Sequence, residues 1–138
     1  MEPTAHDPED ADRAAIRRTA MDYLCGWYEG DAERMRRALH PELAKRAILT
    51  DPQTGARRFH HLTQADMVAQ TTRGGDSDVP PDQRYYDVAI LDRYGDIASV
   101  RAESYLYVDY LHMARAEADG HWVIVNALWA DNRAAPRP

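Results

Sequence analysis

Apolar residues recur at helical spacing near the start of the chain. Counted from the first member, the others follow at offsets of 4, 7, 8, 11 and 12 positions, which places them on one face of an amphipathic helix. Asp7 can cap this helix, Pro8 suits its first position, and Gly30 can end it. The pattern predicts a long first helix with this stripe: Ile16, Ala20, Tyr23, Leu24, Trp27 and Tyr28.

A short second helix is predicted directly after the first. Asp31 can open it, with Met35 and Ala38 on one side. Pro41 ends it, because the residue before a proline is disfavoured in the helical region. This leaves His40 at the helix exit.

A hairpin and a third helix are expected next. Residues 47–50 and 57–62 are typical of two strands joined by a turn. Thr63 and Asp66 have the spacing of a capping box, which predicts a helix that stops at the following glycine pair. Residues 74–83 are expected to form a linker.

The second half of the chain has the pattern of strands separated by turns. Gly95 and Gly120 each lie in a turn signal, and Asp-Gly between apolar runs is typical of a hairpin. These signals predict an antiparallel meander of four strands: residues 84–92, 97–110, 112–117 and 121–130.

Helices followed by strands are the order of an α+β domain whose helices lie on one face of an antiparallel sheet. The 138 residues suffice for one such domain with its own core. We expect it to span residues 9–131, between a flexible segment at 1–8 and a flexible tail at 132–138.

The last predicted strand is apolar on both alternating faces, whereas a strand with one solvated face would alternate. One set of its side chains can face the core. The other set, with Val123, Val125 and Trp129, can face a second copy of the chain. The sequence therefore predicts a homodimer through the sheet.

Four segments resemble a known pattern: Tyr-x-x-Gly-Trp-Tyr-x-Gly-Asp at 23–31, Leu-His-Pro-x-Leu at 39–43, Val-Asp-Tyr-Leu-His at 108–112, and Asp-Gly-x-Trp-x-Ile-Val-Asn at 119–126. The likeness is to the Putative lumazine-binding family of the nuclear transport factor 2-like superfamily. It implies a cone-shaped fold of three helices on a strongly curved antiparallel sheet, usually dimeric, with a pocket at the open end. Related members are ketosteroid isomerase-like, polyketide cyclase-like and dehydratase proteins, so the fold alone does not assign a function.

Charge and composition disfavour several partners. The formal net charge of −6 repels nucleic acid and anionic membrane surfaces, and no apolar run is long enough to span a bilayer. The single cysteine, Cys25, excludes an intrachain disulfide, which leaves the cytoplasm as the default location. Neighbours on a strand point to opposite faces, so His60 and His61 cannot chelate one metal, and we expect neither a metal nor a cofactor.

Two of the three candidate catalytic residues, Asp109 and His112, lie in the 108–112 motif. An inward-pointing Asp109 would have a raised pKa and could carry a proton near neutral pH, although an aspartate can also simply bond backbone amides at a bulge. His112 should face the opposite side of the strand unless a bulge intervenes. His40 is the third candidate; both histidines also have ordinary structural roles.

Candidate ligand-binding residues are mostly aromatic. Tyr23 and Trp27 lie one helical turn apart and could stack on a flat ligand, although core packing is the more frequent role. Asn126 interrupts an apolar strand and needs a partner if it is buried. Tyr105, Tyr107 and Trp129 complete the set.

Three functions remain open from the sequence. The first is a small-molecule-binding protein with an aromatic-lined pocket and an unidentified ligand. The second is a cofactor-free isomerase, cyclase or dehydratase, with Tyr107 or Tyr23 steadying an oxyanion. The third is a dimeric scaffold or regulatory module.

Overall fold

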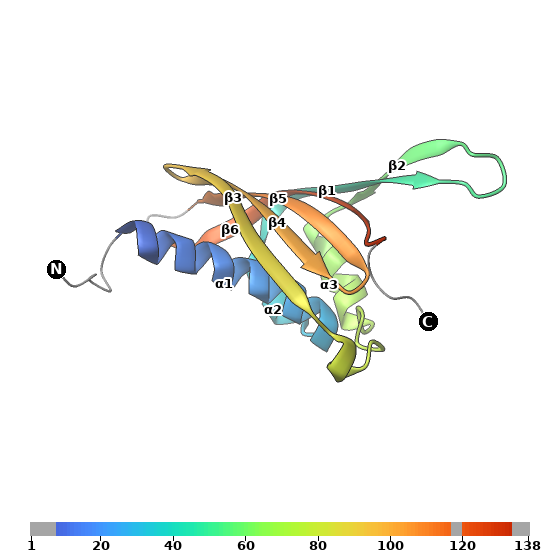
Figure 1. The fold of residues 1–138 in the computed structure, drawn as a ribbon, viewed down its shortest axis with the longest axis horizontal. Coiled ribbons are helices and arrows are strands. Elements are labelled where there is room, and N and C mark those ends of the chain that lie inside the picture. Colours follow the sequence, from blue (N-terminus) through green and yellow to red (C-terminus); the bar gives the residue numbers. More distant parts are fainter. Residues whose placement is uncertain (1–7, 117–119, 134–138) are drawn as a thin grey trace.

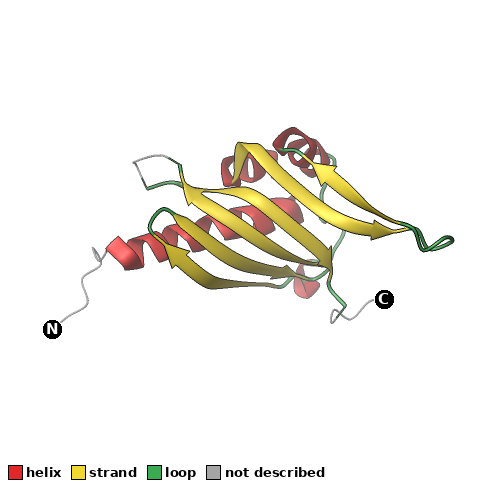
Figure 2. Ribbon diagram, turned by 90° about the horizontal axis from the view of Figure 1, so that it is seen from above, coloured by secondary structure: helices red, strands yellow, loops and turns green. Residues whose placement is uncertain are grey.

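A single six-stranded sheet carries the α-helices on one of its faces (Figures 1 and 2). The computed structural model describes residues 8–116 and 120–133. The helices are α1 (Pro8–Glu29), α2 (Ala32–Ala38) and α3 (Gln64–Thr72), with a short 3₁₀ turn η1 (Pro81–Gln83). The strands are β1 (Leu39–Thr50), β2 (Arg57–Leu62), β3 (Tyr86–Tyr94), β4 (Ile97–Ser104), β5 (Tyr107–Arg115) and β6 (Trp122–Asp131). The sheet order is β2-β1-β6-β5-β4-β3.

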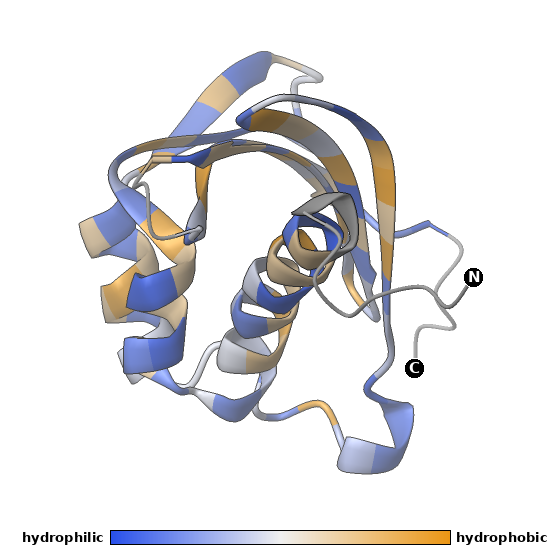
Figure 3. Ribbon diagram, turned by 90° about the vertical axis from the view of Figure 1, so that its left-hand side faces the viewer, coloured by the Kyte–Doolittle hydropathy of each residue, from blue (hydrophilic) through white to orange (hydrophobic). Residues whose placement is uncertain are grey.

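The sheet curves over the helices and encloses the hydrophobic core (Figure 3). The apolar stripe of α1 is confirmed: Ile16 and Ala20 are fully buried, and Tyr23, Leu24 and Tyr28 are nearly so. Trp122 of β6 is also fully buried, and its Nε1 donates to Asp12 near the start of α1 over 3.3 Å. These contacts fix α1 beneath the concave face of the sheet.

The α+β class is confirmed, but the sheet is mixed. The meander β3-β4-β5-β6 is antiparallel as predicted, and β1-β2 form the predicted hairpin, which projects beyond the helices in Figure 1. β1, however, runs parallel to β6. Since β6 lies about eighty residues further along the chain, local pattern does not reveal this pairing. The pairing also extends β1 back to Leu39, so His40 lies in this strand and not at a helix exit.

The third helix is confirmed in detail. The Thr63 side chain accepts from the backbone of Asp66, and the Asp66 carboxylate accepts from the Thr63 backbone, which completes the capping box. Among the described helices, none is long and apolar enough to cross a bilayer.

The prediction of one continuous strand over residues 97–110 is wrong, because a turn at Tyr105 and Leu106 separates β4 from β5. The Tyr28 hydroxyl accepts from the Tyr105 backbone over 2.7 Å, and Ser104 Oγ accepts from the Tyr107 backbone over 3.2 Å. This turn is therefore held largely by a tyrosine from α1. β5 then continues through position 111, where the sequence pattern suggested a break, to Arg115.

A β-bulge in β6 changes which side chains face inward. Asn126 pairs with His112 and Ile124 pairs with Met113, so Val125 is the extra residue. Before the bulge Trp122 and Ile124 point into the core. After it, Trp129 lies on the inner side while Leu128 is exposed. The expectation that Trp129 shares the outer face with Val125 is therefore wrong.

The chain ends are only partly described. Residues 1–7 and 134–138, and with them most of the expected flexible ends, lie outside the described residues, as does most of the turn at 118–120. Asn132, expected in the tail, is 2% exposed. Its Nδ2 donates to the Ser104 carbonyl over 2.9 Å and its backbone N–H donates to the Leu106 carbonyl over 2.8 Å. Asn132 is therefore bound to the turn between β4 and β5 and does not belong to a free tail.

Candidate functional site

An inner cavity of about 210 Å³ lies between the end of α1 and the concave face of the sheet. Four aromatic residues line it, together with polar side chains from β1, β2, α3, β4 and β5. The aromatic residues are Tyr23, Trp27, Tyr107 and Trp129, and the polar ones are Lys45, His60, Gln70, Ser104 and Asp109. The cavity is partly open to solvent. A small pocket with apolar walls and a few converging polar groups is the usual form of a ligand site.

Three polar side chains form a buried hydrogen-bonded chain at this cavity. Nζ of Lys45 donates to the Tyr23 hydroxyl over 2.6 Å, and that hydroxyl donates to Oδ2 of Asp109, also over 2.6 Å. The exposed fractions are 8% for Lys45 and 4% for each of the other two residues. We call these residues the Lys45–Tyr23–Asp109 relay, since each hydrogen bond offers a path for one proton.

Strand alternation directs two members of the relay inward. Along β1, Lys45 lies between Leu43 and Ala47, which are both buried on the inner face. Along β5, Asp109 shares the inner face with Leu111 and is paired with Trp129 of β6. The Lys45 ammonium also lies 5.0 Å from the ring centre of Tyr23 and 5.9 Å from that of Trp129. The contact with the Trp129 ring replaces part of the hydration that the lysine loses on burial.

Burial disfavours charge at both ends of the relay. It raises the pKa of Asp109, while the Lys45 charge and the Tyr23 hydrogen bond oppose part of that rise. Burial likewise lowers the pKa of Lys45, against the attraction of Asp109. Burial and the nearby Asp109 hold the pKa of Tyr23 well above its ordinary value, so this group stays a phenol. A proton can therefore move along the relay between the Asp109 carboxyl group and the Lys45 amine. For each of these two groups, the charged and neutral forms are closer in free energy in this site than they are in water.

The structure separates the three predicted catalytic residues. Only Asp109 lines the inner cavity. His112 is on the opposite face of β5, as alternation predicts, where its Nδ1 lies 3.5 Å from Nδ2 of the exposed Asn126. His40 is half-buried at the start of β1, and its Nδ1 accepts from the Glu42 backbone over 3.0 Å. A joint role of these three residues in one site is not supported by this geometry.

Most of the predicted ligand-binding residues lie together. Tyr23, Trp27, Tyr107 and Trp129 line the inner cavity, and the rings of Tyr107 and Trp129 meet edge to face with centres 5.2 Å apart. The other two candidates lie elsewhere: Tyr105 packs with Tyr28 and Val79 in a separate small cluster, and Asn126 is on the outer face.

Lys45 and His60 were missed as site residues. Lys45 is the only lysine in the chain; every other residue among its 17 basic ones is an arginine. A single lysine in a chain whose other cationic residues are arginines is a signal that sequence reading could have used. His60 and His61 point to opposite faces as predicted, since they pair with Ala47 and Arg46 of β1. Among the described residues, no three His, Cys, Asp or Glu side chains gather as a metal site would need.

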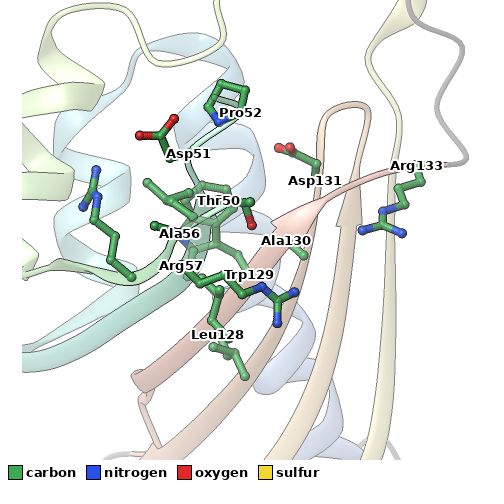
Figure 4. Close-up of a pocket in the computed structure, with 14 residues that line it drawn as sticks. Thr50, Asp51, Pro52, Ala56, Arg57, Leu128, Trp129, Ala130, Asp131 and Arg133 are labelled. Carbon is green, nitrogen blue, oxygen red and sulfur yellow. The ribbon is translucent and has the colours of Figure 1, made fainter. Parts of the chain in front are cut away.

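A second, wider hollow of about 950 Å³ lies between the β1-β2 hairpin and the end of β6 (Figure 4). Its charged residues, including Asp51, Arg57, Asp131 and Arg133, are all exposed. Trp129 lines both this hollow and the inner cavity, so the two adjoin. The outer hollow lacks the buried polar groups of the inner cavity, which is therefore the stronger candidate site.

Comparisons with known structures agree on the fold. A nuclear transport factor 2-like protein of unknown function from Silicibacter pomeroyi superimposes with a TM-score of 0.73 at 16% identity, covering 90% of this chain and 98% of that one. A similar protein of unknown function from Shewanella baltica gives 0.63 at 17% identity, with 96% and 100% covered. A protein with a cystatin-like fold from Burkholderia xenovorans gives 0.62 at 19% identity, with 96% of each chain covered. No curated protein matches the sequence.

The comparison of the sequence with family models assigns a family as well as a fold. The model of the Putative lumazine-binding family matches residues 11–130, which include β1–β5, all but the last residue of β6 and nearly all of α1. The match contains the whole inner cavity and every member of the relay. The chain therefore belongs to the Putative lumazine-binding family and has the nuclear transport factor 2-like fold.

Proposed function

We propose that the protein binds a small, flat molecule in the inner cavity. The observation that carries this proposal is the buried Lys45–Tyr23–Asp109 relay at the edge of a cavity with aromatic walls. Aromatic rings supply stacking surface, and a few fixed polar groups supply orientation. The family's name points to a pteridine-like ligand of the same kind.

One residue of the cavity wall favours a ligand with an acceptor atom. Among the described residues, Nε1 of Trp129 is buried and has no hydrogen-bond partner. A buried donor without a partner costs about 1–3 kcal/mol, which a ligand oxygen or ring nitrogen would recover. Lys45 lies beside the same ring and adds a second donor. We therefore expect the ligand to present a carbonyl oxygen or a similar acceptor to this corner.

Thermal-shift and calorimetric measurements with pteridines, flavins, steroids and aromatic polyketides test the proposal. A ligand at 100 times its Kd should stabilise the fold by about 2.7 kcal/mol. Given a cavity of about 210 Å³, we expect the largest shift with the bicyclic pteridines. Trp129→Phe keeps the ring but removes the donor, and should weaken binding by about tenfold.

Tyr110→Phe is the matched control, because Tyr110 lies on the outer face of the adjacent strand β5. This variant should bind as tightly as the parent chain. If no flat ligand raises the melting temperature, the binding proposal fails and the scaffold interpretation gains support. If both variants bind equally well, the Trp129 donor takes no part in binding.

A second candidate, a cofactor-free isomerase, cyclase or dehydratase, is favoured by one observation. Asp109 is buried with a raised pKa and is hydrogen-bonded to a phenol that can steady a developing oxyanion. Absorption spectra of the same compounds, recorded over time with the protein, test this candidate, since turnover of a substrate would change its spectrum. That change should disappear in Asp109→Asn.

We also propose that the chain forms a homodimer through the outer face of the sheet. Several large apolar or aromatic side chains on this face are more than half exposed, among them Ile48, Phe59, Tyr110 and Leu128. Tyr110 and Leu128 are directly paired across β5 and β6, so they form one continuous patch at the centre of the sheet. A contiguous apolar patch of this kind marks an interaction surface, and the proposed occupant is the same face of a second copy.

A further inference from the structure

Lys45 is unusual in two respects, its uniqueness in the chain and its burial, because lysines are mostly exposed in proteins. It is the only lysine in the chain, and it is 8% exposed at the wall of the inner cavity. Arginine supplies all other basic side chains, and a guanidinium does not lose its proton in proteins. The single side-chain amine of the protein is therefore held in the cavity, away from bulk water.

The relay allows this amine to become a nucleophile. Its two hydrogen bonds run in one direction, from the amine to the phenol and from the phenol to the carboxyl group. If one proton moves along each bond, the result is a neutral amine, an intact phenol and a carboxylic acid. The lowered pKa of Lys45 and the raised pKa of Asp109 both favour that neutral state.

We propose that Nζ of Lys45 forms a Schiff base with the carbonyl carbon of a small, flat aldehyde or ketone bound in the inner cavity. This inference rests on the proposed binding function and names carbonyl compounds as its ligand class. Tyr23 and Asp109 serve as the proton carriers of the step. Trp129 and Tyr107 provide the aromatic walls against which the rest of the ligand packs.

The atoms of this step balance without a cofactor. The Nζ lone pair attacks the carbonyl carbon, a C–N bond forms, and the π electrons of the C=O bond move to oxygen. That oxygen receives one proton from the amine through Tyr23 and a second from Asp109. The C–O bond then breaks and water leaves. An iminium cation remains on Lys45 beside the Asp109 carboxylate, which neutralises its charge.

Two carbonyl probes test the inference on the full chain. The first probe is benzaldehyde, used together with sodium cyanoborohydride. The cyanoborohydride reduces any Schiff base that benzaldehyde forms to a stable secondary amine. Acetylacetone needs no reductant, because its adduct with a neutral amine rearranges to an ultraviolet-absorbing enaminone. Peptide mapping by mass spectrometry should find both adducts on Lys45. The unique lysine makes this assignment unambiguous, since the only other amine is the chain's N-terminus.

The neighbouring residue provides a matched control. Arg46 is exposed on the outer face of β1, one position beyond Lys45. The double variant Lys45→Arg with Arg46→Lys keeps the composition but moves the lysine into water. An ordinary lysine, with a pKa of about 10.4, is neutral in roughly one molecule in a thousand near pH 7.4. Acetylacetone labelling should therefore fall by at least about 10²-fold.

Two further variants keep the test decisive if the double variant fails to fold. Arg46→Lys alone carries both lysines, and fragment spectra should place the adduct on Lys45. Tyr23→Phe keeps both ends of the relay but removes the proton path, and should slow labelling by about 10²-fold, the lower end of general acid–base effects. Circular dichroism checks that each variant is folded.

The outcomes separate this inference from the proposed function. Flat ligands that bind, without an adduct on Lys45, overturn the Schiff base and leave the binding function standing. Equal labelling at both lysines of the Arg46→Lys variant also overturns it. If neither ligands nor adducts are found, both proposals fail. Selective labelling of Lys45 that depends on Tyr23 supports the inference.

Discussion

At the scale of single residues, the carboxylate of Asp22 on α1 is hydrogen-bonded to two arginines of α2. It accepts hydrogen bonds from Nε of Arg34 over 2.8 Å and from Nη2 of Arg37 over 3.1 Å, while its side chain is 9% exposed. Burial by itself would raise the pKa of Asp22, but the two arginines outweigh that effect and lower it. The charged form of Asp22 therefore stabilises the fold.

This environment predicts a pH-dependent stability difference. At pH 7, Asp22→Asn should lower the free energy of unfolding by about 1–3 kcal/mol, because the charge-assisted hydrogen bonds are lost. A folded-state pKa below the unfolded value contributes stability that is fully present above the unfolded pKa and is lost as pH falls through the folded one. The gap between parent and variant should therefore close in acid. Urea denaturation at neutral and acidic pH measures this gap.

The exposed Asp87 of β3 provides the control. Asp87→Asn should change stability by less than about 0.5 kcal/mol, as surface substitutions usually do. A gap for Asp22→Asn that stays constant from neutral to acidic pH would contradict this account of the two arginines.

At the residue scale, strand alternation gave the correct faces along β5 but the wrong face for Trp129, which follows the bulge in β6. It placed Asp109 and His112 on opposite faces of β5, which the structure confirms. It missed Lys45 because residues 39–46 were not read as a strand, so no alternating phase was available to turn that lysine inward. The roles assigned to Asp109, Tyr23, Trp27, Tyr107 and Trp129 remain predictions.

At the scale of elements, the segment after α3 holds the aromatic end of α1 in place. The Asp76 backbone N–H donates to the Trp27 carbonyl over 3.0 Å. Gly75 has φ +53°, and a Cβ at this position would lie 2.3 Å from the same carbonyl oxygen. Both the backbone angle and the close approach therefore require glycine there.

Gly75→Ala should consequently displace Trp27, one wall of the inner cavity. We expect a loss of stability larger than the roughly 1–3 kcal/mol of a strained backbone angle alone, together with weaker ligand binding. Thermal denaturation and ligand titration measure both effects. Gly55→Ala is the matched control, because Gly55 has φ +75° but no neighbouring atom within 4 Å of the added Cβ. Equal effects of the two substitutions would show that the contact with Trp27 is unimportant.

The predicted elements were correct where local chemistry determines them. The stripe on α1 and the capping box of α3 needed only neighbouring residues. The turn at Tyr105 and Leu106 lacks glycine, proline and asparagine, and it depends on the distant Tyr28 hydroxyl. The first half of β1 likewise depends on its pairing with β6. Interactions between distant segments therefore account for the elements that sequence reading missed.

At the scale of the whole molecule, the proposed dimer can be tested directly. Size-exclusion chromatography with light scattering should give the mass of two chains at micromolar concentration. Tyr110→Asp combined with Leu128→Asp places two charges in the centre of the outer patch and should give monomers that still bind ligand. Monomeric parent protein under these conditions would contradict the dimer without affecting the inner cavity.

The extra residue in β6 also determines how relatives can be compared. A relative that lacks the counterpart of Val125 would have a regular strand here, with the counterparts of Leu128 and Trp129 still on their present faces, so an alignment gap belongs at this position. Equivalent side chains must therefore be matched separately on the two sides of this position. An alignment that places the gap beyond Trp129 would assign residues 126–129 to the wrong faces of the sheet, and any function inferred by analogy would then rest on side chains from the opposite surface.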